Sequence, residues 1–187
     1  MMKLVIQILI LSGLLSQNIY AMPDVSKAFK EVTFITSKEE SMTLDEHQGK
    51  IILVFFGYTH CPDICPTTML DIRRSLIELE DIADKVQPIF ISVDYQRDTP
   101  QIVTKYVNFF DDRILGLSSS KEMIDKMTKY FKIPYELVDN ANNPNYIVEH
   151  SSNLYIIDKN MIVKRIIPNG LPHSEITKTV RSLNGVN

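Results

Sequence analysis

The chain contains two cysteines, spaced so that both thiols could serve one redox or metal site. Cys61 and Cys65 are separated by Pro-Asp-Ile, and Pro66 follows directly. A disulfide between them would close a very short loop and would restrict the unfolded chain little. A redox pair or a pair of soft metal ligands is therefore a better interpretation than a structural staple.

The sequence around the pair favours a reactive thiol. An apolar run, 51–56, precedes the cysteines, and a helical pattern of apolar residues follows them. Pro66 suits the first position of a helix, which would place Cys65 at or beside the N-cap. A thiol there is biased towards thiolate by the helix dipole and the free N–H groups. Two cysteines with a histidine suit copper in either oxidation state.

A third ligand would have to come from one of the four histidines, His47, His60, His150 and His173. His47 lies among charged residues and is expected to be solvated. His60 is adjacent to Cys61, and neighbours in sequence usually point apart. His173 precedes the last predicted helix, where capping or exposure is the ordinary role. His150, at the front of a long apolar segment, is a candidate ligand, with a buried core histidine as the competing interpretation.

Apolar patterns along the chain predict alternating strands and helices. Strands are expected at 32–36, 41–44, 51–56, 88–93, 114–117, 146–158 and 162–167. Helices are expected after Cys65, over 100–110 with Thr99 as the N-cap, after Ser119 or Ser120 as the N-cap, and after Ser174 as the N-cap. The first two strands and the last two should each form a hairpin. A parallel βαβ half followed by a ββα half is the thioredoxin layout. We therefore predict an α/β, thioredoxin-like fold: a central mixed sheet flanked by helices, with an extra N-terminal β-hairpin.

Residues 1–21 have the layout of a secretory signal peptide: a basic start at Lys3, an apolar run and a small residue, Ala21. The run is short for a bilayer span of about 20 residues. Ile19 is bulky for the third position before a cleavage site, so an uncleaved membrane anchor is the alternative. Either way we expect export, to the periplasm or the periplasmic face of the inner membrane in a bacterium.

Composition indicates one globular domain. The 187 residues are 44% apolar and 23% charged, with a net charge of −3. This mixture disfavours bulk disorder, and the absence of a basic excess disfavours nucleic-acid binding. We expect 22–31 to be a flexible lead-in and 32–187 to form the domain.

Three segments together resemble the Sco/SenC family of copper-binding proteins. They are FFGYTHCPDICPTTM (55–69), FISVDYQRDTP (90–100) and YIVEHSSNLYIID (146–158). The resemblance covers roughly residues 30–183. Its cysteine motif is specific, because thioredoxins separate their cysteines by two residues and this family by three.

The resemblance implies a thioredoxin fold and a role in assembling the CuA centre of cytochrome c oxidase subunit II. It implies one copper ion, Cu(I) or Cu(II), held by Cys61, Cys65 and His150. The sequence departs from the family pattern at Tyr95, where proline is usual, and at Glu149, where aspartate is usual. Both positions lie outside the implied ligand set.

Two functions of different classes follow. The leading hypothesis is a copper metallochaperone, whose partners would be subunit II and other copper chaperones or thiol–disulfide proteins. The alternative is an enzyme, a thiol–disulfide oxidoreductase that uses Cys61 and Cys65 to reduce the cysteines of a copper acceptor. Peroxide reduction on the same fold is a third option without an independent sequence feature.

Overall fold

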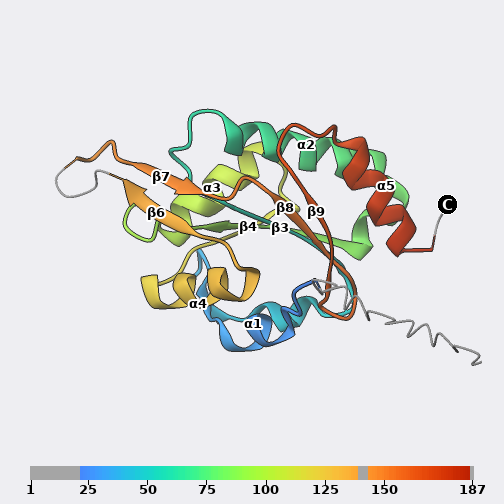
Figure 1. Ribbon diagram of the computed structural model, residues 1–187, viewed down its shortest axis with the longest axis horizontal. Coiled ribbons are helices and arrows are strands. Elements are labelled where there is room, and N and C mark those ends of the chain that lie inside the picture. Colours follow the sequence, from blue (N-terminus) through green and yellow to red (C-terminus); the bar gives the residue numbers. More distant parts are fainter. Residues whose placement is uncertain (1–21, 139–142, 186–187) are drawn as a thin grey trace, which may run out of the picture.

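The computed structural model describes residues 22–138 and 143–185, and a mixed five-stranded sheet forms its centre (Figure 1). In spatial order its strands are β5 (Leu115–Leu117), β4 (Val86–Ser92), β3 (Ile51–Gly57), β8 (Leu154–Ile157) and β9 (Val163–Ile167). β3, β4 and β5 run parallel to one another, whereas β8 and β9 continue the sheet with antiparallel pairing. This arrangement confirms the predicted thioredoxin-like fold.

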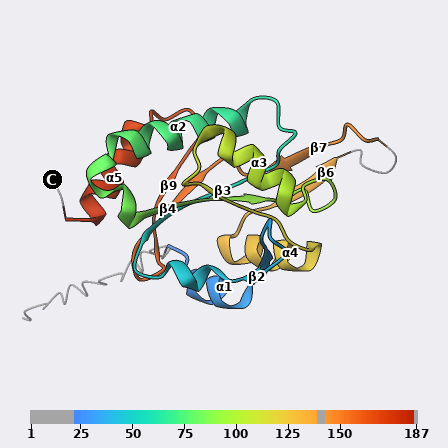
Figure 2. The ribbon, with the colours of Figure 1, turned by 180° about the vertical axis from the view of Figure 1, so that it is seen from behind.

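Helices cover both faces of this sheet. α2 (Ile64–Glu78), α3 (Pro100–Phe110) and α5 (Ser174–Leu183) lie on one face, and α1 (Ser26–Glu31) and α4 (Lys121–Phe131) lie on the other (Figure 2). A short 3₁₀ helix, η2 (Glu80–Lys85), leads from α2 into β4. All seven residues of β3 are buried, as a strand between two helical layers requires.

Two helices begin at the predicted caps. The Thr99 hydroxyl accepts a hydrogen bond from the Ile102 amide at the start of α3, and the Ser120 hydroxyl accepts one from the Met123 amide at the start of α4. The predicted start of α2 is wrong. α2 begins at Ile64, so Cys65 lies in the first turn and Pro66 at the third position. The first N–H groups of a helix have no partner within it, so proline is tolerated there.

The N-terminal part of the domain packs more closely than predicted. α1 falls within the expected lead-in 22–31, but Ala28 and Phe29 are fully buried, and the Val25 amide donates to the Met161 carbonyl at 3.1 Å. The expectation of a flexible lead-in is therefore wrong for 25–31, because this segment completes the core beside α4.

A hairpin follows α1, as predicted, although its strands are shorter. β1 (Phe34–Ile35) and β2 (Ser41–Met42) pair antiparallel, and the 3₁₀ helix η1 (Leu44–His47) follows. The predicted signal peptide, 1–21, lies outside the described residues. In the part of the chain that the structure describes, none of the helices combines the length and apolar character needed to cross a bilayer.

A two-stranded arm projects from the central domain (Figure 1). It consists of β6 (Tyr135–Val138) and β7 (Ile147–His150), which pair antiparallel in a sheet of their own. The sequence analysis missed β6 and expected one continuous strand over 146–158. That strand is instead interrupted at 151–153, so its first half belongs to the arm and its second half, β8, to the central sheet. His150 is the last residue of the arm.

Candidate metal centre

Three side chains with metal-binding atoms converge where the arm meets the central sheet. One ligand atom each of Cys61, Cys65 and His150 lies within 4.8 Å of the other two. Cys61 lies in the loop after β3, Cys65 in the first turn of α2 and His150 at the end of β7. The Cys65 Sγ and His150 Nε2 atoms lie 3.7 Å apart. The structure thus brings together all three residues that the sequence analysis put forward.

The orientation of the His150 imidazole is defined by its second nitrogen. Nδ1 lies 2.8 Å from the Ser151 carbonyl oxygen, which can only accept, so Nδ1 carries the proton and donates. In the neutral ring, Nε2 then presents its lone pair towards the sulfurs. The rings of Phe55 and Tyr58 meet the imidazole edge-on at 6.3 and 5.8 Å between centroids. These contacts hold the ring in a pose suited to ligation.

The two cysteines are free thiols with different environments. Cys61 is partly exposed, whereas Cys65 is completely buried. The hydrogen bond from the Cys65 thiol and the backbone N–H groups of Asp63 and Cys65 lower the pKa of Cys61 to about 5. The same thiol–thiol contact, together with burial, raises the pKa of Cys65. At neutral pH the pair therefore consists of an accessible thiolate and a buried thiol.

Gly57, the last residue of β3, leaves room for the buried sulfur. A Cβ atom added at this position would lie 2.9 Å from the Cys65 Sγ atom and 2.8 Å from a Phe90 ring carbon. Such contacts are far inside normal van der Waals separation. The absence of a side chain at residue 57 is therefore what lets Cys65 pack against the end of the strand.

This donor set fits one soft metal ion. Thiolate and imidazole ligands lie about 2.0–2.3 Å from a metal such as Zn²⁺, so two donors at a tetrahedral angle on one ion are separated by about 3.5 Å. The 3.7 Å between the Cys65 and His150 donor atoms matches that separation. Two sulfurs and one imidazole nitrogen are ligands that copper and zinc accept, whereas magnesium and calcium prefer oxygen.

Comparison with known proteins identifies the family. A profile described as SCO1/SenC matches residues 21–185. The chain belongs to the SCO1/SenC family. It is 35% identical over 148 residues to the SCO2-like protein of Rickettsia felis, an alignment that spans 76% of this chain and 69% of that protein.

Solved structures of the SCO1/SenC family share this fold. Arabidopsis thaliana ScoI with copper bound superimposes with a TM-score of 0.75 at 28% identity, covering 82% of this chain and 96% of that one. Bradyrhizobium japonicum ScoI with copper bound gives 0.73 at 30% identity, covering 81% and 96%. Copper is thus present in structures homologous to this SCO1/SenC protein.

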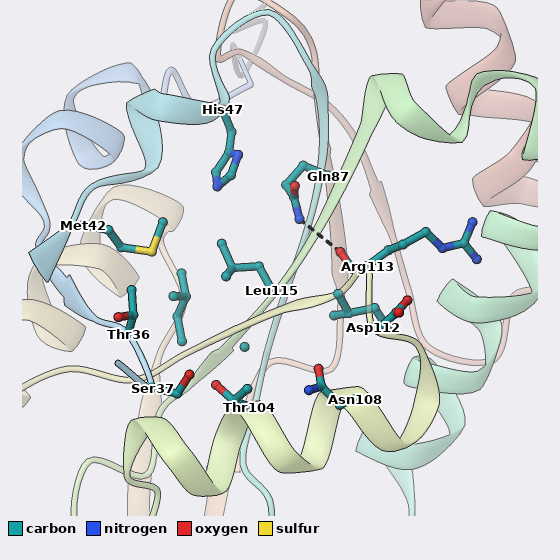
Figure 3. A pocket seen from close by; sticks show the side chains of 13 residues that line it. Thr36, Ser37, Met42, His47, Gln87, Thr104, Asn108, Asp112, Arg113 and Leu115 are labelled. Atoms are coloured by element: carbon teal, nitrogen blue, oxygen red, sulfur yellow. Dashed lines mark hydrogen bonds between the residues drawn. The ribbon is translucent and has the colours of Figure 1, made fainter. Parts of the chain in front are cut away.

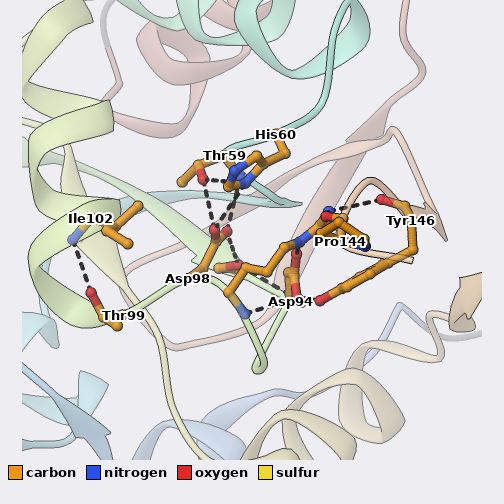
Figure 4. A network of polar contacts seen from close by, with 10 residues as sticks. Thr59, His60, Asp94, Asp98, Thr99, Ile102, Pro144 and Tyr146 are labelled. Atoms are coloured by element: carbon orange, nitrogen blue, oxygen red, sulfur yellow. Dashed lines mark hydrogen bonds and ion pairs between the residues drawn. The ribbon is translucent and has the colours of Figure 1, made fainter. Parts of the chain in front are cut away.

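A second polar cluster in this SCO1/SenC protein does not fit a metal ion. Donor atoms of His60, Asp94 and Asp98 lie within 4.8 Å of one another (Figure 4). The Asp98 carboxylate already accepts hydrogen bonds from the Thr59 amide at 2.8 Å, from the Thr59 hydroxyl at 2.6 Å and from the Ser92 hydroxyl at 2.5 Å. An ion would have to displace these donors. The cluster instead ties together the loops that follow β3 and β4.

The Asp94 carboxylate likewise already accepts hydrogen bonds from protein groups. Its carboxylate accepts from the Arg97 Nε atom at 2.5 Å and from the Tyr146 hydroxyl. The sequence analysis assigned these residues no role, although a buried strand followed by two aspartates and an arginine indicates a polar loop at the end of the sheet that holds the cysteines.

The remaining histidines lie away from the sulfurs. His173 Nε2 is 2.8 Å from a Glu78 carboxylate oxygen, an exposed contact that joins α5 to α2. His47 points into a hollow of about 350 Å³ beside edge strand β5 (Figure 3). Its Nε2 atom is buried and has no hydrogen-bond partner among the described residues. The expectation that His47 is solvated is therefore wrong, and burial lowers its pKa.

Proposed function

We propose that this protein is a copper metallochaperone that holds one copper ion, as Cu(I) or Cu(II), through Cys61, Cys65 and His150. The observation that carries the proposal is the convergence of two sulfurs and one imidazole Nε2 atom within 4.8 Å. Membership of a family whose solved structures include copper-bound proteins supports the choice of copper over zinc.

The chain's own groups are arranged for binding and release of copper. Cys61 is partly exposed and already a thiolate at neutral pH, so it can make the first contact with incoming metal. Cys65 must lose its proton on binding, and the His150 Nε2 atom, which faces the Cys65 sulfur, supplies a lone pair. Copper then passes to an acceptor by exchange of these ligands. Oxidation of the two thiols to a disulfide would remove two of the three ligands.

We further propose that the acceptor is the CuA centre of cytochrome c oxidase subunit II and that the protein works outside the cytoplasm. Residues 1–21 would direct export to the periplasm or anchor the domain at the periplasmic face of the inner membrane. Transfer of copper from loaded protein to the metal-free soluble domain of subunit II would test the choice of acceptor.

Copper stoichiometry tests the ligand set. Reduced protein is dialysed against copper and the bound metal is measured. We expect one copper per chain in the wild type and in the control His173→Ala, which lies away from the sulfurs. The His150→Ala variant should retain weakly bound copper, and the double variant Cys61→Ser, Cys65→Ser should retain none. One-to-one copper in the double variant would overturn the proposal.

The asymmetry of the thiol pair supports a second candidate, a thiol–disulfide oxidoreductase. The Cys61 thiolate would attack a disulfide of the acceptor, and the Cys65 thiol would resolve the mixed disulfide. The acceptor disulfide gains two electrons and becomes two thiols, with one proton from Cys65 and one from solvent, and Cys61 and Cys65 become a disulfide. The His150→Ala variant separates the candidates. Intact thiol exchange with lost acceptor maturation favours copper delivery, and unchanged maturation favours the redox role.

A further inference from the structure

We propose that Arg97 is a positioning residue for His150: it latches the β6–β7 arm to the central domain and so holds the imidazole over the two sulfurs. The inference rests on the proposed function only for its copper measurements, because the latch itself can be tested in metal-free protein.

The arm needs an attachment because its sheet is separate from the central one. Within the described residues, β7 pairs only with β6, in a two-stranded sheet. An isolated two-stranded hairpin is marginally stable in water. The position of His150, at the end of β7, therefore depends on the contacts that hold this hairpin against the domain.

Arg97, in the loop after β4, makes such contacts at the start of β7. Its Nη1 atom donates to the carbonyl oxygens of Tyr146 at 2.9 Å and Pro144 at 3.1 Å (Figure 4). The guanidinium carbon lies 3.5 Å from the centre of the Tyr146 ring, a close cation–π contact. The Arg97 side chain thus contacts both the backbone and the Tyr146 ring at the residues that lead into β7.

Asp94, in the same loop after β4, completes the latch on the side of the central domain. Fully buried, it accepts from Arg97 Nε at 2.5 Å and from the Tyr146 hydroxyl, so the three side chains form a closed ring of contacts. Only 15% of the Arg97 side chain and 6% of Tyr146 are exposed. Water therefore competes weakly with these bonds, and the guanidinium must keep its orientation to serve all of them.

Arg97 also reaches the wall of the metal site. Its guanidinium carbon lies 5.8 Å from the centre of the Tyr58 ring, and that ring meets the His150 imidazole edge-on, at 5.8 Å between centroids. The same residue therefore influences His150 by two routes, through strand β7 and through the aromatic ring that flanks the imidazole.

Arg97→Lys is the decisive variant. Lysine keeps the charge beside Asp94, so the domain should still fold, but a single ammonium cannot replace the guanidinium fork that bonds Asp94 and two carbonyls together. Arg74→Lys is a matched control, because Arg74 pairs with Asp71, also three residues earlier, on the exposed surface of α2. Equal circular dichroism and urea midpoints in the two variants would establish that both are folded.

Amide hydrogen exchange of Ile147–His150 in metal-free protein measures the latch directly. We expect exchange to rise at least tenfold in Arg97→Lys and to stay unchanged in Arg74→Lys. Copper affinity should fall about 10- to 100-fold in Arg97→Lys, the usual cost of losing a residue that orients a ligand. Tyr146→Phe, which loses only the hydroxyl contact to Asp94, should show a smaller change of the same kind.

A double variant shows whether Arg97 acts through His150. With His150→Ala already present, Arg97→Lys should not weaken copper binding further. Equal losses in both backgrounds, or unchanged exchange in Arg97→Lys, would overturn the inference. If the wild type bound no copper but the exchange rose as expected, the proposed function would fail while the latch stood.

Discussion

The Nε2 atom of His150 lies 3.7 Å from the Sγ atom of Cys65, although 85 residues separate them in the chain. His150 ends a two-stranded arm, and Cys65 lies in the first turn of a helix that covers the central sheet. The candidate metal centre therefore depends on how the arm is held. It also depends on the protonation of the thiols, on the space at the end of β3 and on the stability of the domain.

Copper affinity should increase with pH. Binding must displace the proton of Cys65, whose pKa is raised, whereas Cys61 is already deprotonated above about pH 5. Release of one proton per ion makes the dissociation constant fall about tenfold for each pH unit. Competition titrations between pH 7 and 8, with calorimetry in buffers of different ionisation enthalpy, would measure this. An affinity independent of pH would show that Cys65 does not deprotonate on binding.

Cys61 should be alkylated through its thiolate from mildly acidic pH upwards. Its pKa of about 5 predicts that the rate with iodoacetamide is nearly constant from pH 6 to 8 and falls as pH drops through 5. Cys65 should react slowly because it is buried. In Cys65→Ala, which removes the strongest donor to the thiolate, the midpoint of the Cys61 profile should move upward. Mass spectrometry of modified peptides distinguishes the two cysteines; a wild-type midpoint near 8.5 would contradict the assignment.

Gly57→Ala should damage both the fold and the metal centre. The added Cβ atom would lie 2.9 Å from Cys65 Sγ, and overpacking of this kind costs about 1–3 kcal/mol of unfolding free energy. Gly116→Ala is a matched control, because its Cβ atom would meet Val107 at 2.9 Å, away from the sulfurs. Urea unfolding should show losses in both variants, but copper affinity should fall only in Gly57→Ala. Equal affinities would mean that Cys65 tolerates displacement.

His47 should make the domain less stable at acidic pH. Burial lowers its pKa, so the folded protein keeps the imidazole neutral while the unfolded chain takes up a proton below about pH 6.5. Its contribution to stability is thus complete above that pH and is lost as pH falls. The difference in urea midpoint between pH 7 and 5.5 should shrink in His47→Gln. Met42→Leu, which changes the same hollow without a titratable group, should behave like the wild type.

Local patterns accounted for most of the central domain. The continuous apolar runs of β3 and β4 indicated strands buried on both faces, and Thr99 and Ser120 marked two helix starts correctly. β6 was missed because four residues after a proline carry little periodic signal. α1 was missed for a similar reason: its six residues are helical mainly because Ala28 and Phe29 fill a gap in the core, and that gap arises only when distant segments assemble.

The amino-acid sequence alone indicates the chemistry that this protein has available: two thiols separated by three residues at a helix start, and four histidines as candidate partners. It also indicates the parallel strands that precede the thiol loop, because their continuous apolar runs are typical of strands buried on both faces. Residue patterns left several histidines open beside the family resemblance, and the assembled fold is what brings His150 to the sulfurs and lets the two thiols share a proton. Those outcomes depend on the break at 151–153, on the separate pairing of β7 and on contacts such as Arg97 with Tyr146, which join residues far apart in the chain.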